Sequence, residues 1–116
     1  MSLEALLQAQ WSDYADRHRD RVNLLIHIVA VPLFWIGTIS AASSLLFEGL
    51  VHALGGIALM ALALFAQGLG NDREAIPAPP ADDAWDAIRR VAAEQFVTFP
   101  RFVISGGWWR NLNSAG

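Results

Sequence analysis

The sequence contains no cysteine and few charged residues, which make up only 16% of its 116 positions. Without cysteine, the chain forms no disulfide, has no thiolate nucleophile and cannot bind a metal through sulfur. Soluble domains carry charged residues at about 25% of their positions, so the deficit indicates that lipid is part of the environment. The net charge is −3 and the basic residues form no run, which argues against nucleic acid as a partner.

Two long segments, 22–47 and 49–71, carry no formal charge. A helix that crosses a bilayer needs about 20 mostly apolar residues, and both segments are long enough. Only Glu48 and Gly49 separate their apolar parts. The sequence therefore predicts an all-α membrane protein, a hairpin of two transmembrane helices over 22–47 and 49–70. The alternative is a soluble bundle, but a single domain of this length rarely covers two such helices completely.

The arginines flank the hairpin and are absent from its turn. By the positive-inside rule this pattern predicts that both termini are cytoplasmic. Three arginines precede the first span and five follow the second: Arg17, Arg19, Arg21, Arg73, Arg89, Arg90, Arg101 and Arg110.

Amphipathic segments flank the two spans, and we expect them to cap the hairpin on the cytoplasmic side as parts of one domain, 1–116. Leucines and aromatic residues at helical spacing predict a helix over 3–18. Residues 76–83, with the sequence IPAPPADD, predict a proline-rich loop. Apolar residues at helical spacing then predict a helix over 84–104, in which Pro100 should cause a kink or an end.

Polar residues near the start of the first span are the best candidates for a site. His27 follows His18 by nine positions, which would place the two on opposite faces of an unbroken helix. They can converge only if the chain breaks between them, as residues 19–21 would allow. Asn23 and His27 share one face, and polar groups at that depth mark a site or an interhelical hydrogen bond, for example to Gln67. Their spacing does not separate these alternatives.

Carboxylates from two other segments are expected on the same side of the membrane. Glu74 follows the second span and Glu94 lies on the last helix. The simpler interpretation is that Glu74 belongs to a solvated turn and that Glu94 pairs with Arg90. Two histidines and one carboxylate, however, are the ligand set of non-haem Fe(II) oxygenases. His52 is predicted at the opposite end of the hairpin, about one membrane thickness away, and therefore outside any such site.

The polar pattern resembles a known family. Residues 14–32 read Y-x3-H-x4-N-x3-H-x4-P, residues 67–70 read Q-x2-G, and Glu74 and a Pro-Ala pair at 77–78 follow. Together with the closing segment EQFVTFPRF, residues 94–102, this is similar to the small membrane proteins related to the yeast 2-hydroxy-palmitate dioxygenase, and to a short bacterial branch of them. The resemblance covers about residues 14–109.

The resemblance implies an Fe(II)-dependent dioxygenase that shortens 2-hydroxy fatty acids by one carbon, in the inner membrane of a bacterium. Its iron ligands would include His18 and His27. The family usually has a histidine where this chain has Asn71, and an amide oxygen is a weaker iron ligand. Either a carboxylate such as Glu74 or Glu94 completes the site, or the chain has lost its iron.

On this hypothesis the remaining site residues support the metal or the substrate. Tyr14 and Asn23 would orient the imidazoles, and Glu94 would complete or support the ligand sphere. The substrate's acyl chain would lie along Phe34, Trp35 and Phe65, and its carboxylate near Arg17, Arg21 or Arg73. The competing hypothesis is a non-catalytic membrane protein whose polar cluster holds helices together or binds lipid. The sequence leaves the oligomeric state open.

Overall fold

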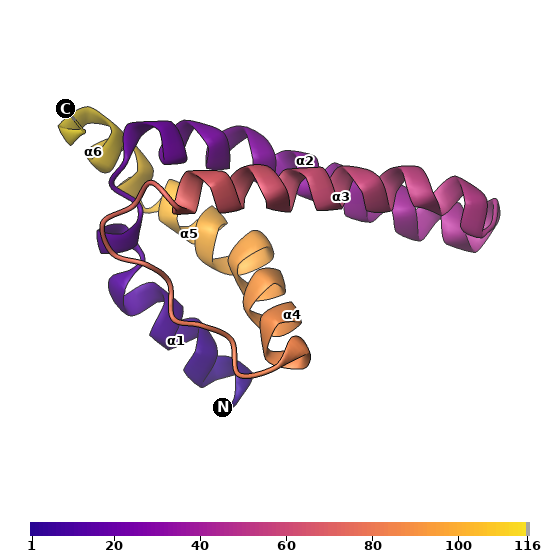
Figure 1. Ribbon diagram of the computed structural model, residues 1–116, viewed down its shortest axis with the longest axis horizontal. Coiled ribbons are helices and arrows are strands. Elements are labelled where there is room, and N and C mark those ends of the chain that lie inside the picture. The colour runs from indigo at the N-terminus through magenta and orange to yellow at the C-terminus, as the bar shows by residue number, and fades with distance from the viewer. Residues whose placement is uncertain (116) are drawn as a thin grey trace.

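The computed structural model describes residues 1–115, which form helices and no strand. Figure 1 shows a long hairpin with a group of shorter helices at one end. In chain order the elements are α1 (Leu3–Asp13), the 3-10 turn η1 (Ala15–Arg17), α2 (Arg21–Phe47), α3 (Leu50–Asn71), α4 (Ala84–Ala93), the π turn η2 (Glu94–Thr98), α5 (Phe99–Ile104) and α6 (Gly107–Ser114). The all-α hairpin predicted from the two uncharged segments is confirmed.

The hairpin is held together by close backbone contact between α2 and α3. A Cβ atom on Gly56 would lie 2.5 Å from the backbone nitrogen of Ala41, and one on Gly37 would lie 2.8 Å from the carbonyl oxygen of Gly56. Helices that pack in lipid use small residues at such crossings. Gly49 makes the turn with a φ of 103°, which glycine adopts without steric cost.

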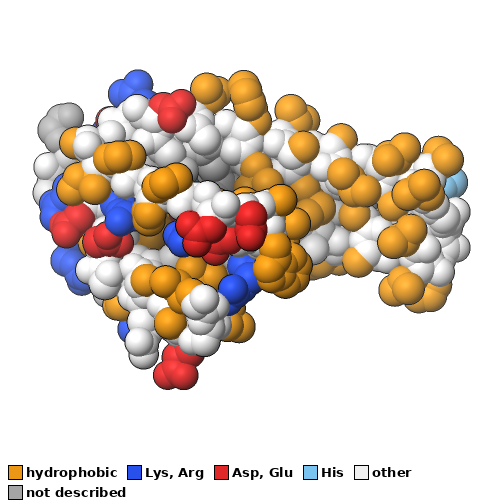
Figure 2. Space-filling model, turned by 60° about the horizontal axis from the view of Figure 1, so that its bottom comes forward, with side chains coloured by type: hydrophobic (Ala, Val, Ile, Leu, Met, Phe, Trp, Pro, Cys, Tyr) orange, Lys and Arg blue, Asp and Glu red, His pale blue; other side chains and the backbone are white. Residues whose placement is uncertain are grey.

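The outer surface of the hairpin is apolar and largely uncovered. Both α2 and α3 are long and apolar enough to cross a membrane, yet only 33% and 22% of their most apolar windows are buried. The core helix of a soluble protein would be mostly covered, so the exposure favours lipid contact over the soluble alternative. In the view of Figure 2, the charged side chains gather at the end of the molecule that lies away from the turn of the hairpin.

The shorter helices and the loop 72–83 pack around the ends of the hairpin at Arg21 and Asn71, and we call this part the base. Its core joins η1, the start of α2, α5 and α6, through Tyr14, Leu24, Val31, Phe99, Phe102, Trp108 and Leu112. The indole Nε1 of Trp108 donates to the carbonyl oxygen of Leu24 at 2.9 Å.

The N-terminal helix is shorter than the predicted 3–18. α1 ends at Asp13, η1 follows, and Asp20 caps α2 through a 3.0 Å hydrogen bond from the backbone nitrogen of Asn23. The helices are therefore interrupted at residues 18–20, which overlap the segment 19–21 where a break would let His18 and His27 converge. The predicted helix 84–104 is continuous through α4, η2 and α5. Pro100 lies in the first turn of α5, and the helix accommodates it with a π turn instead of ending there.

Candidate metal centre

Three side chains from different elements meet where the base joins the hairpin. His18 comes from the break before α2, His27 from the second turn of α2, and Glu94 from η2. One ligand atom from each lies within 4.8 Å of the others. The Oε2 atom of Glu94 is 3.5 Å from Nε2 of His18 and 3.8 Å from Nε2 of His27. These three residues could hold a metal ion.

Backbone hydrogen bonds turn both imidazoles toward this point. Nδ1 of His18 lies 2.8 Å from the carbonyl oxygen of Tyr14, and Nδ1 of His27 lies 3.0 Å from that of Asn23. A carbonyl only accepts, so each Nδ1 is the donor, and in the neutral form of each ring the lone pair on Nε2 is the one that could bind a metal. Both Nε2 atoms are buried and have no hydrogen-bond partner among residues 1–115. Buried unpaired polar atoms cost free energy, and a metal ion would satisfy both.

The π turn brings Glu94 to the histidines. In η2 the backbone nitrogen of Phe99 donates to the carbonyl oxygen of Glu94, five residues back. Pro100 has no amide hydrogen and cannot donate to the carbonyl oxygen of Gln95, which would be its partner in the same π register. The indole Nε1 of Trp35, on α2, supplies that hydrogen bond instead, at 2.7 Å.

Gln95 is fixed a second time through its side chain. It is fully buried and exchanges two amide hydrogen bonds with Gln67 on α3, at 2.9 and 2.7 Å. The interhelical hydrogen bond predicted for Gln67 therefore exists, but with Gln95 as its partner. Together with Trp35, it ties the residue next to Glu94 to both helices of the hairpin.

Tyr14 connects two members of the group. Its ring stacks on His18 with centroids 3.8 Å apart, and its hydroxyl donates to Oε2 of Glu94 at 2.8 Å. Burial alone would raise the pKa of Glu94, but the nearby imidazoles of His18 and His27 and the hydroxyl of Tyr14 outweigh it and lower the pKa. Burial, reinforced by the charge of Glu94, raises the pKa of Tyr14. These two shifts keep the proton on Tyr14 and the charge on Glu94, so the Tyr14 hydroxyl is the donor and the Glu94 carboxylate the acceptor.

Glu74 and Asn71, the other predicted metal ligands, form hydrogen bonds beside the two histidines. Oε1 of Glu74 accepts from the backbone nitrogens of Arg19 and Asp20 at 2.9 and 3.1 Å, and Oε2 accepts from Nδ2 of Asn23 at 2.6 Å. These hydrogen bonds stabilise the backbone of the break that precedes α2. Oδ1 of Asn71 lies 3.4 Å from the same amide nitrogen of Asn23. The carboxylate that lies near both histidines is Glu94, which the sequence left as an alternative to Glu74.

Asn23 reaches this network because α3 presents a glycine beside it. A Cβ atom on Gly70 would collide with Oδ1 of Asn23. Asn23 is completely buried, and its backbone carbonyl orients His27 while its side chain binds Glu74. The contact with Asn23 therefore explains why residue 70, the glycine of the Q-x2-G pattern, has no side chain.

A cavity of about 280 Å³ is lined by two of the three metal-binding candidates, His18 and Glu94. It lies between α1, the loop after α3 and α4, and Asn71 and Glu74 also reach it. Its walls are largely apolar, with Leu6, Ile76 and Val91 among them, and Tyr14, His18 and Glu94 lie on its lining. An amphiphilic molecule could place its polar end at His18 and Glu94 and its apolar part against these walls. Sequence spacing marked Leu6 as part of an apolar face but could not show that it faces a cavity.

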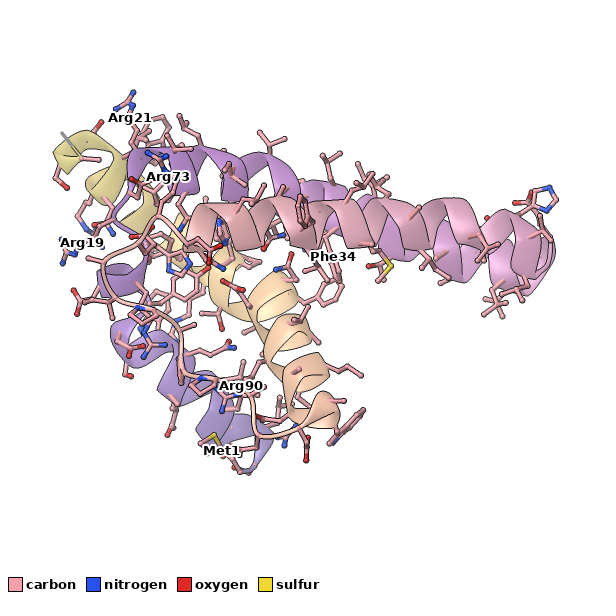
Figure 3. The ribbon with its side chains drawn as sticks, viewed as in Figure 1. Met1, Arg19, Arg21, Phe34, Arg73 and Arg90 are labelled. Atoms are coloured by element: carbon pink, nitrogen blue, oxygen red, sulfur yellow. The ribbon has the colours of Figure 1, made fainter. Side chains whose placement is uncertain are left out.

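Of the predicted substrate-binding residues, only Arg17 lies on this cavity. Its guanidinium pairs with Asp13. Arg73 pairs with Asp20, its Nε 2.7 Å from Oδ2. Arg21 points to the carbonyl oxygen of Leu112. In Figure 3, Arg19, Arg21 and Arg73 lie at the outer end of the base.

The predicted acyl path lies elsewhere too. Phe34 is buried in a cluster with Ala30 and Ala63 of the hairpin, and Phe65 is 67% exposed on its outer surface. Trp35 is half-buried and holds the π turn. Along the described chain, none of these three aromatic residues lines the cavity.

His52 lies apart from this site. Nε2 of His52 is 3.9 Å from the carboxylate of Glu48, and both side chains are more than half exposed near the turn of the hairpin. This is the surface position expected from the sequence.

Comparison of the chain with protein-family models, with curated proteins and with solved structures finds no match.

Proposed function

We propose that this protein is a membrane-embedded, Fe(II)-dependent dioxygenase that acts on 2-hydroxy fatty acids and shortens them by one carbon. We further propose that both termini are cytoplasmic, in a bacterial inner membrane. The family resemblance of the polar pattern suggested this activity, and the site geometry supports it independently.

The observation that carries the proposal is the pair of buried imidazole nitrogens without partners beside Glu94. Two histidines and a carboxylate on one side of a metal suit Fe(II) and leave positions open for oxygen and a substrate. When bound, iron would activate oxygen and coordinate the hydroxy acid. The carboxylate at Glu94 means that the missing histidine at Asn71 does not by itself leave the site one ligand short.

The chain's own groups would orient and bind. The carbonyl oxygens of Tyr14 and Asn23 fix the two imidazole planes, and the hydroxyl of Tyr14 holds the Glu94 carboxylate. Arg17 lines the cavity and its guanidinium pairs with Asp13, so we propose it as the cationic group that binds the substrate's carboxylate. The apolar cavity wall would exclude water from the acyl chain.

The competing proposal, a non-catalytic membrane protein with a structural polar cluster, is favoured by the Gln67–Gln95 and Asn23–Glu74 hydrogen bonds. In both pairs, hydrogen bonds join distant segments of the chain. Such hydrogen bonds stabilise helix contacts in a membrane. The histidine pair does not fit this description, because each Nε2 atom lacks a partner within residues 1–115.

The experiment combines metal analysis with turnover. Detergent-purified protein, prepared without chelators, should bind Fe(II) near one equivalent per chain and consume oxygen with 2-hydroxypalmitate. His27→Ala should abolish both, and His52→Ala, the matched control far from the site, should change neither. Iron binding without oxygen consumption would contradict the proposed substrate. An equal loss of iron binding in both variants would contradict the proposed site.

A further inference from the structure

Helix α4 carries two different faces. One face lines the cavity through Ala87, Arg90 and Val91. The opposite face is apolar and exposed: Trp85 is 66%, Ile88 58% and, one turn beyond α4, Phe96 48% exposed. We call Trp85, Ile88, Ala92 and Phe96, spaced three and four residues apart, the outer stripe. Such spacing places them on one side of a helix.

The outer stripe continues the apolar surface of the hairpin. The ring of Phe96 contacts that of Phe34 on α2, with centroids 5.8 Å apart. From this contact α4 runs obliquely away from the hairpin (Figure 1). Figure 2 shows apolar side chains on the base directly beside the start of the hairpin surface. Whatever covers the exposed residues of α2 and α3 therefore reaches α4 as well.

The charges around the outer stripe suit the polar boundary of a bilayer. Arg89 lies next to the stripe, is half-buried, and donates to the carbonyl oxygen of Met1 at 2.8 Å. Arg90 lies on the cavity face of α4 and forms an ion pair with Asp86, with Nε and Oδ2 2.8 Å apart. An amphipathic helix with a tryptophan and arginines lies in the interface with its apolar face among the acyl chains.

We infer that α4 is an interfacial helix, and that the outer stripe lies in the acyl region of the leaflet that surrounds the base end of the hairpin. The occupant is bilayer lipid, because the stripe is continuous with the hairpin surface and is bordered by arginine. This inference requires no metal and no catalysis. It also means that a single helix separates the lipid from the cavity.

The absence of cysteine allows a direct test, because single cysteines can be spin-labelled without removing native ones. Ile88→Cys would report on the outer stripe, Leu62→Cys on the hairpin surface and Asp16→Cys on the water-exposed base; all three native side chains are more than half exposed. Full-length protein in vesicles of phosphatidylcholine and phosphatidylglycerol is exposed to oxygen, which partitions into lipid, and to a water-soluble nickel chelate.

The label at position 88 should be relaxed mainly by oxygen, as at position 62. Relaxation by the nickel chelate as strong as at position 16 would show that α4 lies in water. Protection from both relaxants, with dipolar broadening between labels, would show that a second copy covers the stripe. Either result overturns the inference. Trp85→Cys repeats the test on the same stripe if Ile88→Cys folds poorly.

Discussion

Replacing Trp35 by phenylalanine tests whether the π turn positions the candidate metal ligand. The substitution keeps an aromatic ring but removes the indole donor, 2.7 Å from the carbonyl oxygen of Gln95. That carbonyl has no donor in the π register of its own helix, because Pro100 lacks an amide hydrogen. Leaving a buried acceptor unpaired costs about 1–3 kcal/mol. The cost falls on the residue next to Glu94, so the π turn should shift and the carboxylate should lose its position.

Metal affinity should therefore fall by about 10–100-fold, as when other supporting contacts of metal ligands are removed. Titration with Co(II), followed by its absorption spectrum, measures affinity and ligand geometry together, and thermal unfolding in detergent measures stability. Trp108→Phe is the matched control, because it removes an indole donor to the carbonyl oxygen of Leu24 at 2.9 Å. It should lower stability and leave the cobalt spectrum unchanged. Wild-type affinity in Trp35→Phe, or equal losses in both variants, would refute the positioning argument.

Two further predictions follow from the geometry. Glu94→Gln should reduce metal affinity by more than about 100-fold, beyond the range of a supporting contact, whereas Asn71→His should change it little. Metal titration of both variants checks this. A large gain of affinity in Asn71→His would show that the third ligand position lies at residue 71. Gly56→Ala should destabilise the hairpin by about 1–3 kcal/mol because the new Cβ meets the backbone of α2. Gly55→Ala, where a Cβ meets nothing within 4 Å, should leave stability unchanged or raise it slightly. Thermal unfolding of the two variants in detergent measures the difference. An equal loss of stability in both variants would contradict the prediction.

The sequence alone determined the hairpin and indicated where a break before its first helix would bring His18 and His27 together. Two uncharged segments separated by Glu48 and Gly49 leave little choice of architecture, because backbone polar groups in lipid must be satisfied within helices. The break followed from geometry, since His18 and His27 lie nine positions apart and can share a site only if the helix does not run through both. These features depend on local composition and spacing, which the sequence displays directly.

Only the tertiary structure decided which carboxylate joins the histidines. Glu74 and Glu94 are both acidic residues on the same side of the hairpin, and neither composition nor periodicity separates them. The choice depends on a π turn that lies next to Pro100 and on the indole of Trp35, which donates to the carbonyl oxygen of Gln95 60 residues later in the chain. Glu74 is instead occupied by the backbone of the break. Contacts between segments so distant in the sequence depend on the register in which the helices meet, and that register is set by packing across the whole molecule.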